Sequence, residues 1–265
     1  MKWAYFYIME QLSVITICFN NLKELQQTCN SVDSQTEHPF EHYIIDGSNN
    51  NEISVWLNTT PQPAYRKWIC EADEGISDAF NKGILHVSGS IIHILNAADV
   101  YFSNTVIAKV VNYFNQHPKT QWISGNIFIK RGGIWVTVGV PFDIQQLYKG
   151  MRAVSHPTWV VRKEVYERVG KFSKNIKIAM DYDLMCRLKS ELYDYVNETF
   201  VKFDDTGIST SQYLKSIKEN TKVYESYFGF SFKARFWQFR LKILYHLLQS
   251  KFGKFLYYIK ANYFK

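Results

Sequence analysis

Short apolar runs alternate with amphipathic runs through the first part of the chain. Apolar and β-branched residues dominate 12–18, 42–45, 65–70 and 91–95, and we predict that these segments are strands. Between them, 21–34 and 76–87 carry apolar residues at helical spacing, and another helix follows Ser103, which we expect to cap it. Strands that alternate with helices indicate an α/β fold with a mostly parallel central sheet flanked by helices.

The order of elements changes after Gln121. Strand-like runs at 122–130, 134–140 and 155–162 follow one another, and 163–169 is a predicted helix. A further helix begins near Ala179, and its apolar side is formed by Leu184, Met185, Leu188 and Leu192. We place a larger N-terminal domain at 1–211 and a C-terminal helical extension at 212–265.

Polar side chains occur where the predicted strands end. Asp46 directly follows the strand at 42–45, and Asn96 and Asp99 follow the strand at 91–95. In open α/β sheets ligands bind outside the carboxyl ends of the strands. The pattern therefore predicts a ligand site at this edge of the sheet.

Composition and charge narrow the class of protein. Apolar residues make up 46% and charged residues 21%, which is typical of a globular protein. The first ten residues lack the features of a secretory signal, so we expect a cytoplasmic protein. The four cysteines show no CxxC spacing, which argues against a zinc site or a disulfide framework. No apolar run reaches the roughly 20 residues that span a bilayer.

The net charge of +7 is concentrated in the tail. From Tyr227 to Lys265 the chain has eight Lys or Arg, no Asp or Glu, and 14 aromatic residues. On a helix, one apolar stripe forms from Phe232, Phe236, Phe239, Ile243 and Leu247. Two interpretations remain open: the stripe lies on the cytoplasmic membrane surface, or it packs on the larger domain or on a second copy in a homodimer. No motif supports nucleic-acid binding.

Six local strings occur in an order typical of one enzyme family. They are TICFNN (16–21), IDGS (45–48), EADEGISDAFNKG (71–83), LNAAD (95–99), MDYDL (180–184) with Arg187, and GIS (207–209). With them the chain resembles the family 2 glycosyltransferases of the GT-A fold, the nucleotide-diphospho-sugar transferase fold, especially bacterial enzymes of capsule, exopolysaccharide or lipopolysaccharide synthesis. The resemblance implies inverting transfer from a nucleotide-diphosphate sugar, with UDP-sugar as the expected donor, to a glycan or lipid-linked glycan acceptor.

The resemblance assigns Asn20, Asp46, Asp73, Asn81 and Asp99 to the donor. Asp99 stands at the DxD-type position and is the candidate ligand for Mn²⁺ or Mg²⁺, a hard cation that would neutralise the leaving diphosphate. Alanines at 97 and 98 supply no second carboxylate, so the protein would bind the cation weakly, or the nucleotide would chiefly hold it. Without the resemblance, Asp46 could equally close an Asx-turn, Asp73 could complement a helix N-terminus, and Asp99 could close a turn.

The catalytic base is expected in the segment Asp181-Tyr182-Asp183. Residues two apart on a helix point to nearly opposite sides, so only one aspartate should face the acceptor. The resemblance places the base at Asp181, although Met180 replaces the acidic residue that usually precedes it. Asp183 is expected to pair with Arg187 at i,i+4. His156 is a candidate contact to acceptor, diphosphate or metal, or else a structural histidine, and the turn at 207–209 has no assigned role beyond backbone shape.

Two other functions compete with sugar transfer. A nucleotidyltransferase would normally carry a Gly-rich basic loop after the first strand, and no glycine occurs at 19–23. A non-catalytic sugar- or lipid-binding protein on a decayed enzyme scaffold would explain the missing carboxylates at 97, 98 and 180. The presence of Asp46, Asp73, Asp99 and Asp181 argues against that second alternative.

Overall fold

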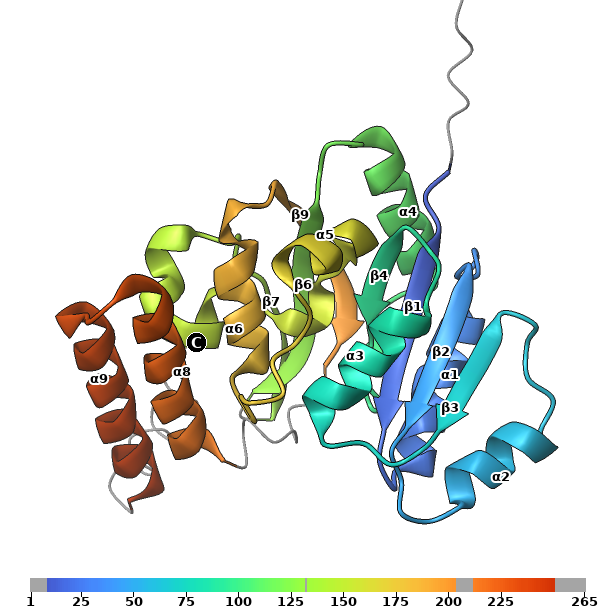
Figure 1. Cartoon of the computed structure of the whole chain (residues 1–265), viewed down its shortest axis with the longest axis horizontal. Helices are drawn as coiled ribbons and strands as arrows, with labels where there is room; N and C mark the ends of the chain where they lie inside the picture. Colours follow the sequence, from blue (N-terminus) through green and yellow to red (C-terminus); the bar gives the residue numbers. More distant parts are fainter. Residues whose placement is uncertain (1–8, 132, 204–211, 251–265) are drawn as a thin grey trace, which may run out of the picture.

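One twisted sheet forms the centre of the molecule (Figure 1). The computed structural model describes residues 9–131, 133–203 and 212–250. Within these residues the strand order is β3-β2-β1-β4-β8-β6-β9-β5, and β7 pairs with β6. The first four strands are parallel, and their bounds are β1 Leu12–Cys18, β2 Glu41–Asp46, β3 Arg66–Cys70 and β4 Ile91–Ile94.

Strands β1 and β4 are buried on both faces, as their mostly apolar sequences predict, whereas the edge strand β3 is partly exposed. Successive residues of a strand point to opposite faces, so Ile15 and Ile45 pack with α3 on one face, whereas Ile44 packs with α1 and α2 on the other. Helices cover the two sides. Their bounds are α1 Leu22–Asp33, α2 Glu52–Thr59, α3 Ile76–His86 and α4 Val106–Gln116.

The second half of the sheet is mixed. Strand β8 (Val160–Arg162) runs antiparallel to both β4 and β6 (Trp122–Arg131), and β6 runs parallel to β9 (Tyr193–Lys202). The short β5 (Val100–Tyr101) and β7 (Ile134–Val138) are antiparallel edge additions. The α/β fold is confirmed, but the mostly parallel arrangement holds only for the strands up to β4. Strand β9 and helix α2 were not predicted.

Several helix ends differ from the expectation. Helix α4 begins at Val106 with Thr105 at the N-cap position and no side-chain cap, so the predicted cap at Ser103 is wrong. Helix α6 (Met180–Arg187) is followed by a single 3₁₀ turn, η3 (Leu188–Ser190), because the chain must turn into β9. Leu192 is consequently 60% exposed and does not belong to the apolar side of that helix. Helix α5 (Lys163–Val169) matches its prediction.

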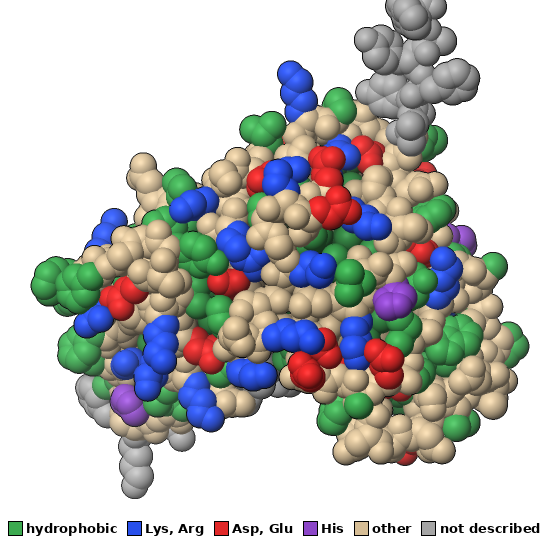
Figure 2. Space-filling view, viewed as in Figure 1, with side chains coloured by type: hydrophobic (Ala, Val, Ile, Leu, Met, Phe, Trp, Pro, Cys, Tyr) green, Lys and Arg blue, Asp and Glu red, His purple; other side chains and the backbone are tan. Residues whose placement is uncertain are grey.

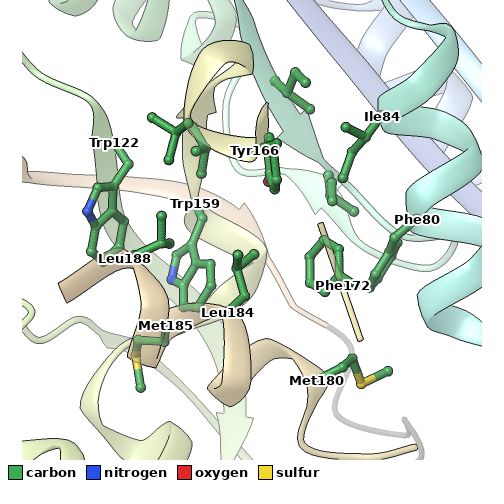
Figure 3. Close-up of a cluster of buried hydrophobic side chains, with 14 of the residues drawn as sticks. Phe80, Ile84, Trp122, Trp159, Tyr166, Phe172, Met180, Leu184, Met185 and Leu188 are labelled. Carbon is green, nitrogen blue, oxygen red and sulfur yellow. The ribbon is translucent and has the colours of Figure 1, made fainter. Parts of the chain in front are cut away.

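The largest apolar cluster lies between the sheet, α3 and α6 (Figure 3). Phe80 and Phe172 meet with ring centroids 4.8 Å apart, and Trp122 and Trp159 meet edge to face at 5.6 Å. Met180 points into this cluster and is 3% exposed. An acidic side chain at that position would therefore be buried in apolar surroundings, which accounts for methionine there.

Two helices close the described chain, α8 (Tyr213–Phe228) and α9 (Phe232–Gln249). Helix α8 lies against α6, and α9 packs on α8 and on the 3₁₀ segment η1 (Ile144–Ala153). The predicted domain boundary at 211 and the turn at 207–209 fall outside the described residues. Within them, no helix is both long and apolar enough to cross a membrane.

Helix α9 turns its predicted apolar stripe to solvent. Its buried side chains are Ala234, Gln238 and Leu241, which face the rest of the molecule. Phe232, Phe236 and Phe239 are 81%, 70% and 60% exposed. The interpretation that this stripe packs on the larger domain is therefore wrong for the described residues, and the membrane and second-copy interpretations remain.

Candidate active site

The loops after β1 and β2 are joined at the carboxyl edge of the sheet. Asn20 has a left-handed φ of 53°, a conformation that asparagine tolerates better than most residues, and its N–H donates to Ser48 Oγ at 2.8 Å. The Gly47 N–H donates to the Cys18 carbonyl at 3.1 Å. Asn20 and Asp46, expected at a donor site, are thus brought close together.

Asp46 closes a turn. Its Oδ1 accepts the Ser48 N–H at 3.0 Å, which is the Asx-turn chemistry that the sequence left open. The residue is 3% exposed and its carboxylate lies beside the Cys18 thiol. Burial, with the neighbouring Asp46 carboxylate as the next cause, raises the pKa of Cys18. This thiol is therefore protonated and structural.

Asp73 reaches over to the loop that carries Asp46. A Cβ built on Gly47 would lie 1.8 Å from Asp73 Oδ2, so a larger residue at 47 would displace the Asp73 carboxylate from its present position. The other oxygen, Oδ1, accepts the Gly75 N–H at 2.8 Å and orders the entry to α3. Three polar residues expected at the donor site, Asn20, Asp46 and Asp73, therefore belong to one continuous group of loops.

Asn81 and Asp78 of α3 hold the segment that leads to α6. The Asn81 side chain donates to the Phe172 carbonyl at 2.8 Å and accepts the Phe172 N–H at 2.9 Å. Asp78 Oδ1 pairs with Lys174 at 2.6 Å, and this pair lowers the pKa of Asp78. Both polar ends of Asn81 are engaged in this contact, a loop-anchoring role that the sequence did not indicate. Its contact with a donor remains a prediction.

Asp99 lies at the end of a constrained turn after β4. Ala98 has a φ of 84°, a left-handed conformation that costs a non-glycine residue roughly 1 kcal/mol or more, and its N–H donates to Thr28 Oγ1 at 3.1 Å. Thr28 Oγ1 also donates to the Asp99 carbonyl at 2.8 Å. These bonds from α1 fix the turn, and Asp99 itself is 3% exposed.

The side chains around Asp99 in the described part of the chain provide few ligands for a metal ion. No group of three or more His, Cys, Asp or Glu side chains in the described residues could hold one. Asp99 is the carboxylate at the DxD-type position, and the neighbouring residues Ala97 and Ala98 contribute no oxygen from their side chains. A hard divalent cation fits here only if the diphosphate and water supply most of its ligands.

Asp181, at the start of α6, lies beside His156. Asp181 Oδ2 is 3.7 Å from His156 Nδ1, and the Asp181 side chain is 25% exposed. Its other oxygen, Oδ1, is buried and has no hydrogen-bond partner among the described residues. Burial raises the pKa of Asp181, and the nearby His156 partly opposes this. A carboxylate with a raised pKa and a side chain that is partly open to solvent is suited to accept a proton.

Aromatic rings fix the position of His156. The rings of Trp159, Phe80 and Phe172 lie 5.0, 5.7 and 5.9 Å from it, and the residue is 6% exposed. It begins the 3₁₀ turn η2 (His156–Thr158). The histidine singled out in the sequence therefore adjoins the proposed base.

His93 links this region to the Asp99 turn. Its Nε2–H donates to the Pro157 carbonyl at 2.9 Å, so Nδ1 accepts from the Tyr101 hydroxyl at 2.9 Å. Burial lowers the pKa of His93 to about 4. The ring therefore stays neutral at pH 7 and keeps this one hydrogen-bonding arrangement.

Asp183 points away from Asp181, as helix geometry predicted. Its Oδ2 pairs with Arg187 at 2.7 Å, which confirms the expected i,i+4 contact. Its Oδ1 accepts from the Tyr227 hydroxyl of α8 at 2.9 Å. Arg187 also donates to the carbonyls of Val169, Gly170 and Lys171, so Asp183 and Arg187 serve structure.

The sequence did not reveal the contacts made by α8. Glu219 Oε2 accepts the N–H groups of Ile178 at 2.8 Å and Ala179 at 2.9 Å, directly before α6. Glu219 lies 40 residues from Ala179 in the chain, and it has no local motif that would have pointed to this contact.

The fold and the grouping of polar loops at the strand ends define a GT-A-type α/β protein. The family description Glycosyl transferase family 2 matches residues 13–170. The chain belongs to this family and is a glycosyltransferase.

Relatives named as glycosyltransferases are similar to most of this chain. An uncharacterised glycosyltransferase of Mycobacterium tuberculosis is 28% identical over 202 residues, which cover 75% of this chain and 77% of the relative. A PGL/p-HBAD biosynthesis glycosyltransferase of Mycobacterium bovis is 22% identical over 223 residues, 80% of this chain and 85% of the relative.

Two solved structures share the fold at low identity. TarS 1–349 of Staphylococcus aureus superposes with a TM-score of 0.62 at 13% identity, over 82% of this chain and 66% of that one. The mannosyltransferase PcManGT of Pyrobaculum calidifontis, in complex with GDP-Man and Mn²⁺, gives 0.61 at 15% identity, over 82% and 64%. TarS has also been solved with UDP-GlcNAc. This chain thus spans about two thirds of each of these two structures.

Proposed function

We propose that the protein transfers a sugar with inversion from a UDP-sugar to a glycan or lipid-linked glycan acceptor in bacterial surface polysaccharide synthesis, and that Asp181 is the base. The observation that carries this proposal is the Asp181 carboxylate, which lies beside His156 at the start of α6, is 25% exposed and has a pKa raised by burial. The Mn²⁺ and nucleotide-sugar complexes of proteins with this fold support a nucleotide-sugar donor.

One base is sufficient for inversion. As the acceptor hydroxyl oxygen forms its bond to the anomeric carbon, the bond from that carbon to the diphosphate oxygen breaks on the opposite face. The hydroxyl proton passes to Asp181, and the diphosphate leaves with the electron pair. Burial strengthens Asp181 as a base by raising its pKa.

The donor lies along the loops that follow β1, β2 and β3. Asn20, Asp46 and Asp73 are the residues we assign to the nucleotide and sugar, because these loops meet at Gly47. Asp99 would hold Mn²⁺ or Mg²⁺ together with diphosphate oxygens. A bound cation supplies positive charge that stabilises the leaving diphosphate.

The acceptor is presented at the cytoplasmic face of a membrane. Exposed apolar side chains of α9 support this part of the proposal, together with a tail from Tyr227 to Lys265 that has eight basic and no acidic residues. Figure 2 shows hydrophobic and basic side chains together at the α8–α9 end of the molecule. Such a surface suits an anionic bilayer that carries a lipid-linked acceptor.

A nucleotide-sugar panel tests the donor and the metal together. UDP-sugars and GDP-mannose are screened by thermal shift with and without Mn²⁺, and nucleotide release is then measured with alkyl glycosides as acceptors. We expect UDP-sugars to stabilise the protein and Mn²⁺ to increase the effect. Affinity for donors with no nucleotide release for any pair would contradict the enzymatic proposal, and a response to GDP-mannose alone would overturn the UDP assignment.

A further inference from the structure

Helix α8 contacts the start and the middle of α6, the helix that carries the proposed base. Glu219 accepts two N–H groups at the start of α6, and Tyr227 donates to Asp183 within it. Helix α8 therefore holds α6 at two points, and it lies beyond the residues matched by the family description.

The contact at Glu219 supplies what α6 lacks locally. Ala179 occupies the N-cap position of α6 and has no side chain that could cap the helix. Helix N-termini carry unpaired N–H groups and a partial positive charge, so a carboxylate at this place is favourable. Glu219 places one oxygen on the N–H groups of Ile178 and Ala179, and Asp181 follows two residues later.

Apolar packing of Ile176, Ala179 and Met180 also holds the end of the 170–179 segment, and among the side-chain hydrogen bonds that this segment makes within the described residues those of Glu219 lie nearest to α6. Asn81 fixes Phe172, Arg187 fixes the carbonyls at 169–171, and Lys174 pairs with Asp78. These contacts lie at the start and middle of the segment. The two bonds to Glu219 lie at its end, directly before Asp181.

We propose that Glu219 is a positioning residue for Asp181, and that the C-terminal extension is thereby part of the catalytic apparatus. This inference rests on the proposed role of Asp181 as base. A base must lie within hydrogen-bond reach of the acceptor hydroxyl, and a displacement of about 1 Å can cost roughly a hundredfold in rate. The residues assigned to the donor in the proposed function, Asn20, Asp46 and Asp73, lie on the loops after β1, β2 and β3, whereas the bonds of Glu219 go to the backbone directly before α6. We therefore expect Glu219 to affect turnover and to leave nucleotide binding unchanged.

The test compares Glu219→Ala, Glu219→Gln and Glu225→Ala in the full chain. Glutamine keeps an oxygen that can accept both N–H groups. Glu225 is a matched control, because it lies on the same helix and is paired with Arg235 of α9 at 2.7 Å, away from α6. Turnover is nucleotide release from the donor and alkyl-glycoside pair that reacts fastest in the panel, and UDP affinity is measured by calorimetry.

We expect Glu219→Ala to lower kcat roughly ten- to a hundredfold with UDP affinity and donor KM unchanged, and Glu219→Gln to recover most of the rate. Glu225→Ala should keep the wild-type kcat. Hydrogen exchange of 176–187 should accelerate in Glu219→Ala alone, which gives a readout even if the alanine variant is unstable at assay temperature.

Wild-type kcat and exchange in Glu219→Ala would overturn the positioning role. An equal fall of kcat and UDP affinity in both alanine variants would also overturn it, since that pattern reports general loosening of the extension. Asp181→Asn is assayed in parallel. If that variant turns over normally, the proposed base itself is wrong, whereas an inactive Asp181→Asn beside a normal Glu219→Ala removes only the positioning role.

Discussion

Asp181 Oδ2 and His156 Nδ1 lie 3.7 Å apart, and the imidazole sits among the rings of Phe80, Trp159 and Phe172. Packing fixes the imidazole, and α6 fixes the carboxylate. The two residues are 25 positions apart in the sequence and come from different elements. From the arrangement of Asp181 and His156 we predict how substitutions change the rate of transfer and its dependence on pH.

Asp181→Asn should lower transfer by roughly 10²- to 10⁴-fold while donor affinity stays near the wild-type value. The amide keeps the shape of the side chain but cannot accept the proton. Nucleotide release measures the rate, and calorimetry with UDP measures the affinity. Wild-type turnover in this variant would remove Asp181 as the base.

Asp183→Asn is the matched comparison on the same helix. It loses the charge that pairs with Arg187, so we expect the free energy of unfolding to fall by roughly 1.5 to 3 kcal/mol. Transfer by the folded fraction should persist. Denaturant unfolding and the rate measured well below the melting temperature separate the two effects, and the opposite pattern would exchange the roles of the two aspartates.

The fall of kcat at low pH should reflect the protonation of Asp181. The base must be deprotonated, and burial raises its pKa, so turnover should fall at a higher pH than an ordinary aspartate would give. His156 lowers the pKa of Asp181, and His156→Gln should therefore move this fall of kcat further toward high pH. The pH dependence of kcat in both proteins is the measurement. If kcat of His156→Gln falls at the same pH as in the wild type, or at a lower pH, the effect of His156 on the pKa of Asp181 is contradicted.

Asp99→Asn should reduce the gain in UDP affinity that Mn²⁺ provides by roughly tenfold or more, because the amide is a weaker ligand for a hard cation. Titration of Mn²⁺ at fixed UDP gives this gain directly. Affinity for UDP without metal and the melting temperature serve as controls for the turn around Ala98. If Mn²⁺ still increases the UDP affinity of Asp99→Asn as much as that of the wild type, Asp99 does not bind the metal.

The sequence predicted the parallel half of the sheet. It also predicted the edge of the sheet at which polar residues follow the strands. Buried parallel strands such as β1 and β4 have mostly apolar sequences, and Asp46, which ends β2, and Asp99, which follows β4, belong to the same carboxyl edge of the sheet. The separation of Asp183 from Asp181 followed from helix geometry, whereas the role of Asp181 as the base stays a prediction that came from the family resemblance. In each case the relevant information is local, within one element or at its end.

The contacts that hold the site together are not local. Asn81 bonds Phe172 across 91 residues, and Glu219 bonds Ala179 across 40. Their partners are backbone groups, which every residue carries, so no sequence pattern marks the pair. The strands β5 and β9 were missed for a related reason, since a two-residue strand and a strand with polar residues depend on their neighbours in the sheet.

Phe232, Phe236 and Phe239 should together control binding to anionic membranes. They are 81%, 70% and 60% exposed, so changing all three to Ser should alter stability little. Full burial of a Phe side chain contributes roughly 1.5 to 3 kcal/mol. Partial burial of the three rings, at about 1 kcal/mol each, would already total about 3 kcal/mol, so their loss should weaken vesicle binding roughly a hundredfold. Co-sedimentation with phosphatidylglycerol-containing vesicles, at low and high salt, measures this.

The matched control removes exposed apolar side chains elsewhere, with Val55→Ser on α2 and Leu192→Ser before β9, which are 49% and 60% exposed. That variant should bind vesicles as the wild type does. Binding should also weaken with salt, because each basic residue near an anionic leaflet contributes about 1 kcal/mol and the tail has eight of them. Equal binding by the triple variant, or none by the wild type, would contradict the membrane role. If light scattering instead shows a wild-type dimer that the triple variant cannot form, the stripe is a surface between two copies of the chain, because the same exposed rings would then be covered by protein.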